Sequence, residues 1–196
     1  MSDKGFKREL HFIGPLYIQS GLGNAARGYH QALTALENTK VVSIPMVEGH
    51  EAHPRLNYDA GPLLDEVGFA SDDVQNTTVF FHQNADGFHM ITQHYQKYLD
   101  APYKKKIALW VWELSEFRKE WIPQAELVDE IWVPSIFVKE AIQKTVKNLI
   151  RVVPYPLKVG LPNETCCRKK YNLEGKFIFG YFFDASSYVD RKNPIA

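Results

Sequence analysis

Short apolar runs alternate with amphipathic stretches along most of this 196-residue chain. The runs have the length and composition of buried strands, and the stretches carry apolar residues at the three- and four-residue spacing of helices. Strands are predicted at Leu10–Ile13, Val41–Pro45, Thr77–Phe81, Lys106–Trp112, Glu130–Val133, Leu149–Val153 and Phe177–Phe183, and helices at Gly23–Leu36, Gly61–Val67, Gly87–Leu99, Phe117–Leu127 and Ser135–Lys147. This alternation predicts an α/β fold, a Rossmann-like parallel sheet with helices on both faces, in which the strand after the first helix lies beside the first strand.

The segment Gly14–Leu36 combines a strand end, a glycine-rich turn (the glycine loop, with Gly21 and Gly23) and an amphipathic helix. Such a turn points free backbone N–H groups and the positive end of a helix dipole at one spot, which favours a phosphate or a carboxylate. Asn24 is the predicted N-cap, and Arg27 would add a full charge one turn later. The alternative is that the glycines only turn the chain.

The same glycines satisfy the dinucleotide-binding pattern G-x-G-x-x-A, here Gly21-x-Gly23-x-x-Ala26. In that fingerprint the first glycine follows the strand almost directly, whereas the segment Gly14–Ser20 intervenes here. The second strand also ends in Pro45 rather than in an acidic residue. A nicotinamide or flavin site is therefore disfavoured.

Polar residues follow the third and fourth predicted strands. His82 comes directly after the third strand, with Asn84 and Asp86 close behind it, and Trp112 and Glu113 end the fourth. Open α/β sheets bind ligands in the crevice beyond the carboxyl ends of their strands. We therefore expect His82 and Glu113 to line one crevice with the glycine loop. The alternatives are that His82 and Asn84 satisfy loop backbone groups and that Trp112 packs in the core.

The loop Val47–Tyr58 invites a metal interpretation, because His50 and His53 lie beside Glu48 and Glu51. A structural zinc site needs four ligands at defined spacing, and no second pair of ligands stands out. We therefore interpret the histidines as solvated loop residues and predict no metal site.

Composition and charge are those of an ordinary globular protein. The chain has 23 Lys and Arg against 23 Asp and Glu, so its charge gives no argument for a nucleic-acid partner. Its two cysteines, Cys166 and Cys167, are adjacent and cannot form an ordinary structural bridge, which fits a reducing compartment. The first residues lack the apolar core of a signal peptide, and no apolar run is long enough to span a bilayer. We expect a cytoplasmic protein.

Several motifs, taken in order, resemble those of bacterial glycosyltransferases of the group 1 superfamily. The specific ones are DEIWVPSIFVKEAI at 129–142 and FFDASSYVDRKNP at 182–194, and VVPYPL at 152–157 lies between them. The resemblance covers nearly the whole chain. It implies the GT-B arrangement, in which two Rossmann-like domains face each other across a cleft. The first domain then binds mostly the acceptor, and the second binds the nucleotide-sugar donor.

The resemblance also implies roles for individual residues. The glycine loop matches the one that approaches the donor diphosphate, His82 matches the strand-end histidine near the transferred sugar, and Arg191 with Lys192 matches the basic pair that holds the donor phosphates. A nucleoside diphosphate leaving group needs such fixed cations; without the resemblance, the pair would be an exposed turn. We assign catalysis to His82 and Glu113, donor and phosphate binding to Gly21, Gly23, Asn24, Arg27, Arg191 and Lys192, and the acceptor side to Asn84, Asp86 and Trp112.

The resemblance divides the chain into an acceptor-side domain at 1–157, a polar linker at 158–176, and the first strand and turn of a donor-binding domain at 177–196. Family members continue for about another domain, so we expect a truncated chain that is inactive by itself. The apolar strand Phe177–Phe183 would then lack a sheet of its own. We expect it to join the edge of the first sheet or to form a dimer through residues 176–183 of two chains.

The expected function is that of a nucleotide-sugar-dependent, retaining glycosyltransferase of polysaccharide biosynthesis. Its substrates would be a nucleotide-diphosphate sugar and a glycan or glycolipid acceptor, with no further cofactor. The glycolipid leaves open a peripheral association with the inner face of the membrane. The alternative is a non-catalytic Rossmann-like binding or scaffold module, with a dehydrogenase as a distant third.

Overall fold

The computed structural model describes residues 8–46, 54–63, 74–157 and 164–181. The chain divides into two units, Met1–Lys158 and Val159–Ala196. In the first unit the strands are β1 (Arg8–Gly14), β2 (Thr39–Pro45), β3 (Thr78–Phe81), β4 (Lys105–Leu109), β5 (Glu130–Val133) and β6 (Leu149–Val152), and the α-helices are α1 (Gly21–Thr34), α2 (His89–His94), α3 (Gln96–Asp100), α4 (Ile122–Ala125) and α5 (Ile136–Ile142). Short 3₁₀ turns occupy Val74–Asn76, Ala85–Gly87 and Lys119–Trp121.

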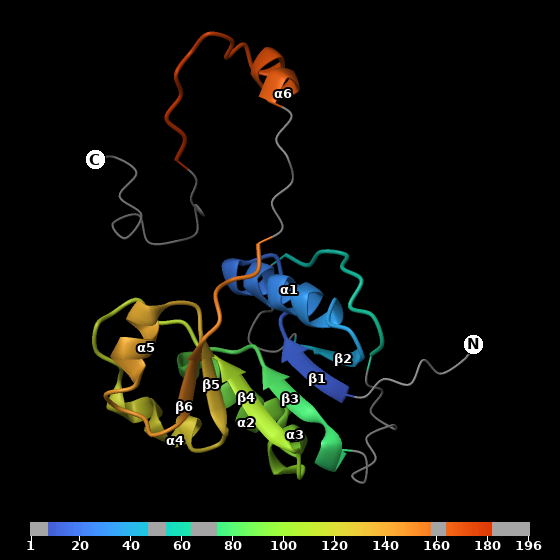
Figure 1. Ribbon diagram of the computed structural model, residues 1–196, viewed down its shortest axis with the longest axis vertical. Helices are drawn as coiled ribbons and strands as arrows, with labels where there is room; N and C mark the ends of the chain where they lie inside the picture. Colours follow the sequence, from blue (N-terminus) through green and yellow to red (C-terminus); the bar gives the residue numbers. More distant parts are fainter. Residues whose placement is uncertain (1–7, 47–53, 64–73, 158–163, 182–196) are drawn as a thin grey trace, which may run out of the picture. The chain divides into compact units, whose positions relative to one another are not determined.

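The six strands form one parallel sheet in the order β2-β1-β3-β4-β5-β6 (Figure 1). The predicted α/β fold is therefore confirmed, and β2 lies beside β1 as expected. The chain runs from β1 outward to β2 on one side and then returns to β3 on the other. The pair β1 and β3 is thus the point at which the strand order reverses, and in open α/β sheets ligands bind beyond the carboxyl ends of such a pair.

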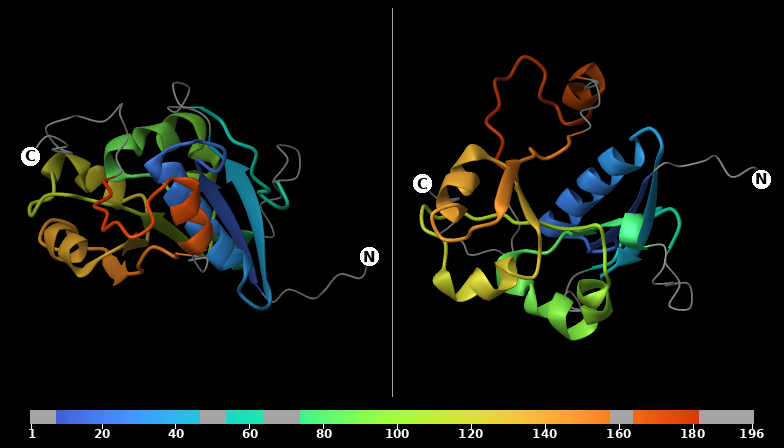
Figure 2. Two further views of the ribbon diagram at one scale, coloured as in Figure 1. Left: turned by 90° about the horizontal axis from the view of Figure 1, so that it is seen from above. Right: turned by 60° about the horizontal axis from the view of Figure 1, so that its bottom comes forward.

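Alternate residues of each strand enter two separate cores, as the two-residue period of a strand requires. Phe12 of β1 and Phe80 of β3 pack under α1, whereas Ile13 and Phe81 pack in the core that contains residues of α2 to α5. Figure 2 shows α1 (blue) on one face of the sheet and α2 and α3 (green) on the other. Because both faces are covered, these strands are continuous apolar runs rather than alternating ones.

The first helix begins earlier than predicted. Ser20 is extended, with φ −147°, and its Oγ accepts a hydrogen bond from the Gly23 amide at 3.1 Å, so Ser20 and not Asn24 is the N-cap. The helix then runs from Gly21 to Thr34. Serine and asparagine both cap well.

Several predicted helices are shorter than their sequence pattern. The predicted helix Gly87–Leu99 is split into α2 and α3 at Tyr95, whose φ is −126°. Within Phe117–Leu127 only a 3₁₀ turn and α4 form, and α5 covers the first part of Ser135–Lys147. The helix predicted at Gly61–Val67 is wrong where it is described, because Gly61 has φ +65° and Leu63 pairs with Ser43 of β2; its later residues lie outside the described part.

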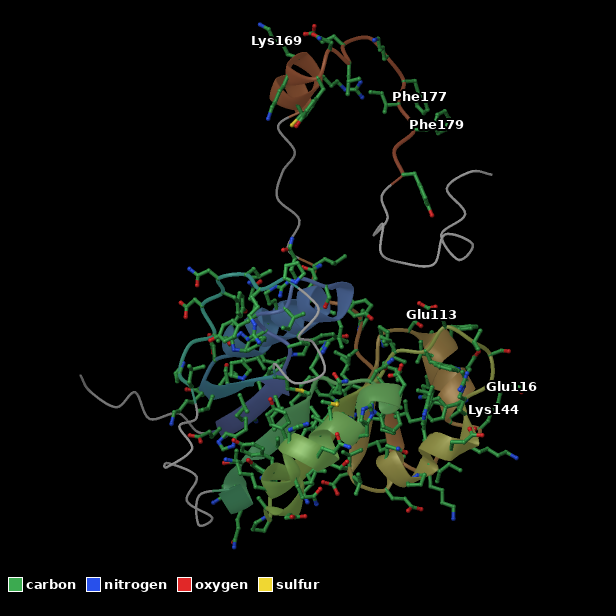
Figure 3. The ribbon with its side chains drawn as sticks, turned by 180° about the vertical axis from the view of Figure 1, so that it is seen from behind. Glu113, Glu116, Lys144, Lys169, Phe177 and Phe179 are labelled. Atoms are coloured by element: carbon green, nitrogen blue, oxygen red, sulfur yellow. The ribbon has the colours of Figure 1, made fainter. Side chains whose placement is uncertain are left out.

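The described part of the second unit holds one helix, α6 (Glu164–Lys170), within the predicted linker. The guanidinium of Arg168 donates to the carbonyl oxygens of Leu173 and Lys176, which folds the following turn back onto the helix. Phe177 and Phe179 are 85% and 91% exposed (Figure 3). Residues 177–181 form no strand, contrary to prediction, and 182–183 lie outside the described part. Pairing through 176–183 stays a prediction, as do the domain boundaries.

Candidate functional site

The carboxyl ends of β1 and β3 bring Gly14 and His82 together. The His82 amide donates to the carbonyl oxygen of Ile13 at 2.7 Å, which extends the pairing of the two strands by one residue. A Cβ at Gly14 would lie 3.0 Å from the Cβ of His82. Because Gly14 has no side chain, the buried side chain of His82 fits beside it, at the point where the strand order reverses.

The His82 side chain is fully buried and chemically unsatisfied. Its ring lies 6.2 Å from the Phe12 ring and 5.7 Å from the Tyr29 ring, measured between centroids. Neither ring nitrogen has a hydrogen-bond partner in another residue of the described chain. Burial lowers the pKa of His82 to about 4, against a smaller opposing effect of its own backbone. At neutral pH the ring is therefore an uncharged imidazole with one N–H donor and one nitrogen acceptor.

The two glycines of the glycine loop have different surroundings. A Cβ at Gly23 would overlap the carbonyl oxygen of Ile18 and lie 3.0 Å from that of Pro15, so this glycine is required by packing. At Gly21, which is exposed, a Cβ would meet nothing within 4 Å. Of these two glycines, Gly21 is therefore the one that is accessible to solvent at the start of α1.

Arg27 holds the loop that precedes α1. Its Nη1 donates to the carbonyl oxygens of Leu16 and Ile18 at 3.1 and 2.9 Å. This nitrogen is committed to the loop, so the predicted phosphate contact of Arg27 would have to use the rest of the guanidinium. Asn24 is exposed, and its amide donates to the Ser20 carbonyl within the first turn.

Asn84 and Asp86 act within the loop after β3. The Oδ1 of Asn84 accepts a hydrogen bond from the Val111 amide at 2.7 Å, which ties this loop to the one after β4. Asp86 is exposed and accepts from the Gly87 amide at 2.9 Å. For Asn84 the structure thus favours the alternative that its side chain satisfies loop backbone.

Trp112 and Glu113 lie beyond β4, which ends at Leu109 and not at Trp112 as predicted. The Trp112 ring is half-buried and stands perpendicular to the Trp121 ring at 4.9 Å, and its Nε1 donates to the Glu116 carbonyl. Glu113 is exposed at the periphery of the unit (Figure 3). Burial raises the pKa of Tyr155, and the nearby Glu113 carboxylate adds to that rise.

These contacts join distant segments at one edge of the sheet. Tyr29 of α1 lies against both His82 and Tyr155, and Tyr155 lies near Glu113. His82 and Glu113 are therefore brought to the same edge, with two tyrosines between them. Arg191, Lys192, His50 and His53 lie outside the described residues. Among the residues that the structure describes, no group of three His, Cys, Asp or Glu side chains could hold a metal ion, and no helix could cross a membrane.

No family model, curated protein or solved structure matches this chain. The strand order, the site geometry and the sequence motifs are therefore the basis for a proposed function.

Sequence reasoning missed Gly14 and the tyrosine pair as parts of the site. Tyr29 was visible as one of the apolar positions of the first helix, but nothing in that pattern indicates its contact with a segment 124 residues later. The signal for Gly14 was its place at the end of the first strand, where a backbone approach is common.

A second buried histidine, His30, contrasts with His82. Its Nε2 lies 2.8 Å from the Ser43 Oγ, and its Nδ1 lies 2.9 Å from the Tyr58 hydroxyl. Ser43 donates to the Ala60 carbonyl at 2.6 Å, so Nε2 of His30 donates to Ser43 and Nδ1 accepts from Tyr58. Both nitrogens are satisfied, and this network holds the segment at 58–60 against α1 and β2.

Proposed function

We propose that this chain supplies the acceptor-side domain of a nucleotide-sugar-dependent glycosyltransferase. The observation that carries the proposal is His82, a fully buried neutral imidazole at the carboxyl ends of β1 and β3 whose two nitrogens have no partner in another described residue. An unsatisfied buried polar group costs stability. Such groups persist at functional sites, where a ligand can satisfy them.

In the proposed reaction the acceptor oxygen forms a bond to the anomeric carbon of the donor sugar. The bond from that carbon to the diphosphate oxygen breaks, the diphosphate leaves with the electron pair, and the acceptor hydroxyl loses its proton. His82 would bind hydroxyl groups of the transferred sugar. Glu113, an exposed carboxylate at the same edge, is the candidate base for the acceptor proton.

The start of α1 would stabilise the diphosphate. Helix N-termini bind phosphate through their free N–H groups and dipole. Gly21 is exposed there, and Arg27 carries a full positive charge one turn away. Arg191 and Lys192 would complete the neutralisation. Proteins of the GT-B type bind most of the donor on a second domain, so the affinity of this domain alone is expected to be weak.

The alternative is a non-catalytic binding or scaffold module. It is favoured by the roles of Gly23, Arg27 and Asn84, each of which has a contact that explains its presence by loop packing alone. The two proposals differ in whether a sugar nucleotide binds beside His82, at the carboxyl ends of β1 and β3.

Titration of the isotope-labelled chain with UDP-glucose, GDP-mannose and NAD, followed by NMR, tests the proposal. We expect at least one sugar nucleotide to shift the Gly21 amide and the His82 ring, with a Kd on the order of 1 mM, about −4 kcal/mol. The Gly61 amide, in a different loop, is the internal control and should not move. If NAD shifts the same signals at lower concentration, a dehydrogenase is favoured. If none of the three does, the scaffold module is favoured.

A further inference from the structure

His82 lies against the ring of Tyr29, which in turn lies against the ring of Tyr155. The Tyr29 ring lies 5.7 Å from His82, and the Tyr155 ring lies 5.9 Å from Tyr29. Exposure rises outward along this series, from 0% at His82 to 1% at Tyr29 and 41% at Tyr155. Tyr29 is therefore an inner layer and Tyr155 an outer layer over the imidazole.

The segment after β6, Val153–Leu157, holds these rings in place, and we call it the connector. The Tyr29 hydroxyl donates to the Val153 carbonyl oxygen at 2.5 Å. The carbonyl oxygen of Pro156 would lie 2.9 Å from a Cβ at Gly28, so the absent side chain of Gly28 admits the connector to the helix surface. Figure 1 shows the connector (orange) passing beside α1 (blue).

The connector is stiff where it meets the helix. Pro154 and Pro156 restrict its backbone. The Val153 amide donates to the Val133 carbonyl at 2.8 Å, which anchors the start of the connector to the sheet. If the connector is displaced, it should therefore move as a unit. It would carry Tyr155 with it and break the hydrogen bond between the Tyr29 hydroxyl and the Val153 carbonyl oxygen.

We propose that Tyr29, Tyr155 and the connector form a hinged cover over His82, which opens to admit a ligand rich in hydroxyl groups. In the closed arrangement both imidazole nitrogens remain unsatisfied, whereas in an opened one they can pair with hydroxyl groups. This gain offsets part of the cost of opening, which breaks the Tyr29–Val153 hydrogen bond and exposes the buried Tyr29 ring. The cover rests on these contacts alone; that the ligand is a sugar rests on the proposed function.

The chemistry of the covered group selects the class of ligand. Burial keeps the imidazole neutral, so one nitrogen donates and the other accepts. Neighbouring hydroxyl groups offer both a donor and an acceptor, and the surrounding Phe12 and Tyr29 rings can lie against the apolar face of a sugar.

The accessibility of His82 to diethyl pyrocarbonate, which acylates neutral imidazole nitrogens, tests the cover in the full chain without any nucleotide. The rate at His82 is measured by peptide mass mapping against that at exposed His94. We expect His82 to react at least about tenfold more slowly than His94 in the unmodified chain. Tyr29→Phe, which removes only the hydroxyl, should raise the His82 rate about five- to tenfold, the effect of one hydrogen bond. Tyr155→Ala, which removes the outer ring, should raise the His82 rate as well.

Tyr58→Phe is the matched control, because it removes a tyrosine hydroxyl that bonds His30 on the same helix. It should leave the His82 rate unchanged. Equal His82 rates in the unmodified chain, Tyr29→Phe and Tyr155→Ala would overturn the cover, as would an equal rise in Tyr58→Phe, which would mean general loosening. If the rates change as expected but no sugar nucleotide shifts His82, the cover stands and the proposed function fails.

Discussion

Gly23→Ala is expected to lower the free energy of unfolding by about 3 kcal/mol, the upper range for overpacking a well-packed site. The added methyl would overlap the carbonyl oxygen of Ile18 and press on that of Pro15. Both are backbone atoms, and the Ile18 oxygen is also held by Arg27. The loop must therefore move as a whole, since no flexible side chain can give way.

Gly21→Ala is the matched control, two residues earlier in the same loop. A Cβ there meets nothing within 4 Å, and alanine favours the helix over glycine, so we expect a change within about 0.5 kcal/mol. Urea unfolding of the three chains measures the difference. Similar losses in both variants would contradict the packing role that the structure gives to Gly23 and not to Gly21.

Glu130→Ala should lower the free energy of unfolding by about 3 kcal/mol. Glu130 is 2% exposed on β5, and its carboxylate accepts from Lys105 of β4 at 2.9 Å, Trp132 at 2.8 Å and Arg151 of β6 at 2.5 Å. Removing one partner of a buried pair usually costs about 3–5 kcal/mol. We expect the lower end of that range because Lys105 and Arg151 are themselves partly exposed and can be hydrated. Glu126→Ala, at an exposed position, should change stability by less than about 0.5 kcal/mol.

The same carboxylate should make stability depend on pH. Burial opposes its ionisation, but the hydrogen bonds from Lys105, Trp132 and Arg151 and the charge of Lys105 together outweigh that effect and hold the pKa of Glu130 below its ordinary value. A carboxyl group with a lowered pKa stabilises the fold above its unfolded-state pKa and loses that contribution as the pH falls through the folded-state value. Glu130→Gln cannot ionise, so its stability should fall less steeply than that of the unmodified chain below about pH 4.5. Parallel profiles would contradict the role of the charge.

The sheet was predictable because parallel strands covered on both faces are continuous apolar runs. Val79, Phe80 and Phe81 show this clearly, with each of the three fully buried. Helix ends were less predictable. Tyr95 interrupts a stretch whose apolar spacing suits a longer helix, whereas Pro123 lies in the first turn of the short helix α4.

The site was predictable in part. The position of His82 followed from the rule for strand ends, and the structure places it there. Its surroundings did not follow, because Tyr29 and Val153 are distant in sequence and meet only through the tertiary fold. The interpretation of Asn84 as a ligand group could not be separated from a structural role, since its partner, the Val111 amide, is a backbone group that sequence does not mark.

We infer that His82 lies at the carboxyl ends of β1 and β3 to bind a ligand and not to stabilise the fold. Comparing the unfolding free energies of His82→Leu and His30→Leu tests this claim most directly. Both histidines are buried, but among the described residues only the ring nitrogens of His30 have hydrogen-bond partners, whereas those of His82 have none in another residue. We predict that His82→Leu is as stable as the unmodified chain or more so, while His30→Leu loses about 2 kcal/mol by leaving Ser43 and Tyr58 unpaired. An equal loss in both variants would contradict the claim, since His82 would then be a structural residue.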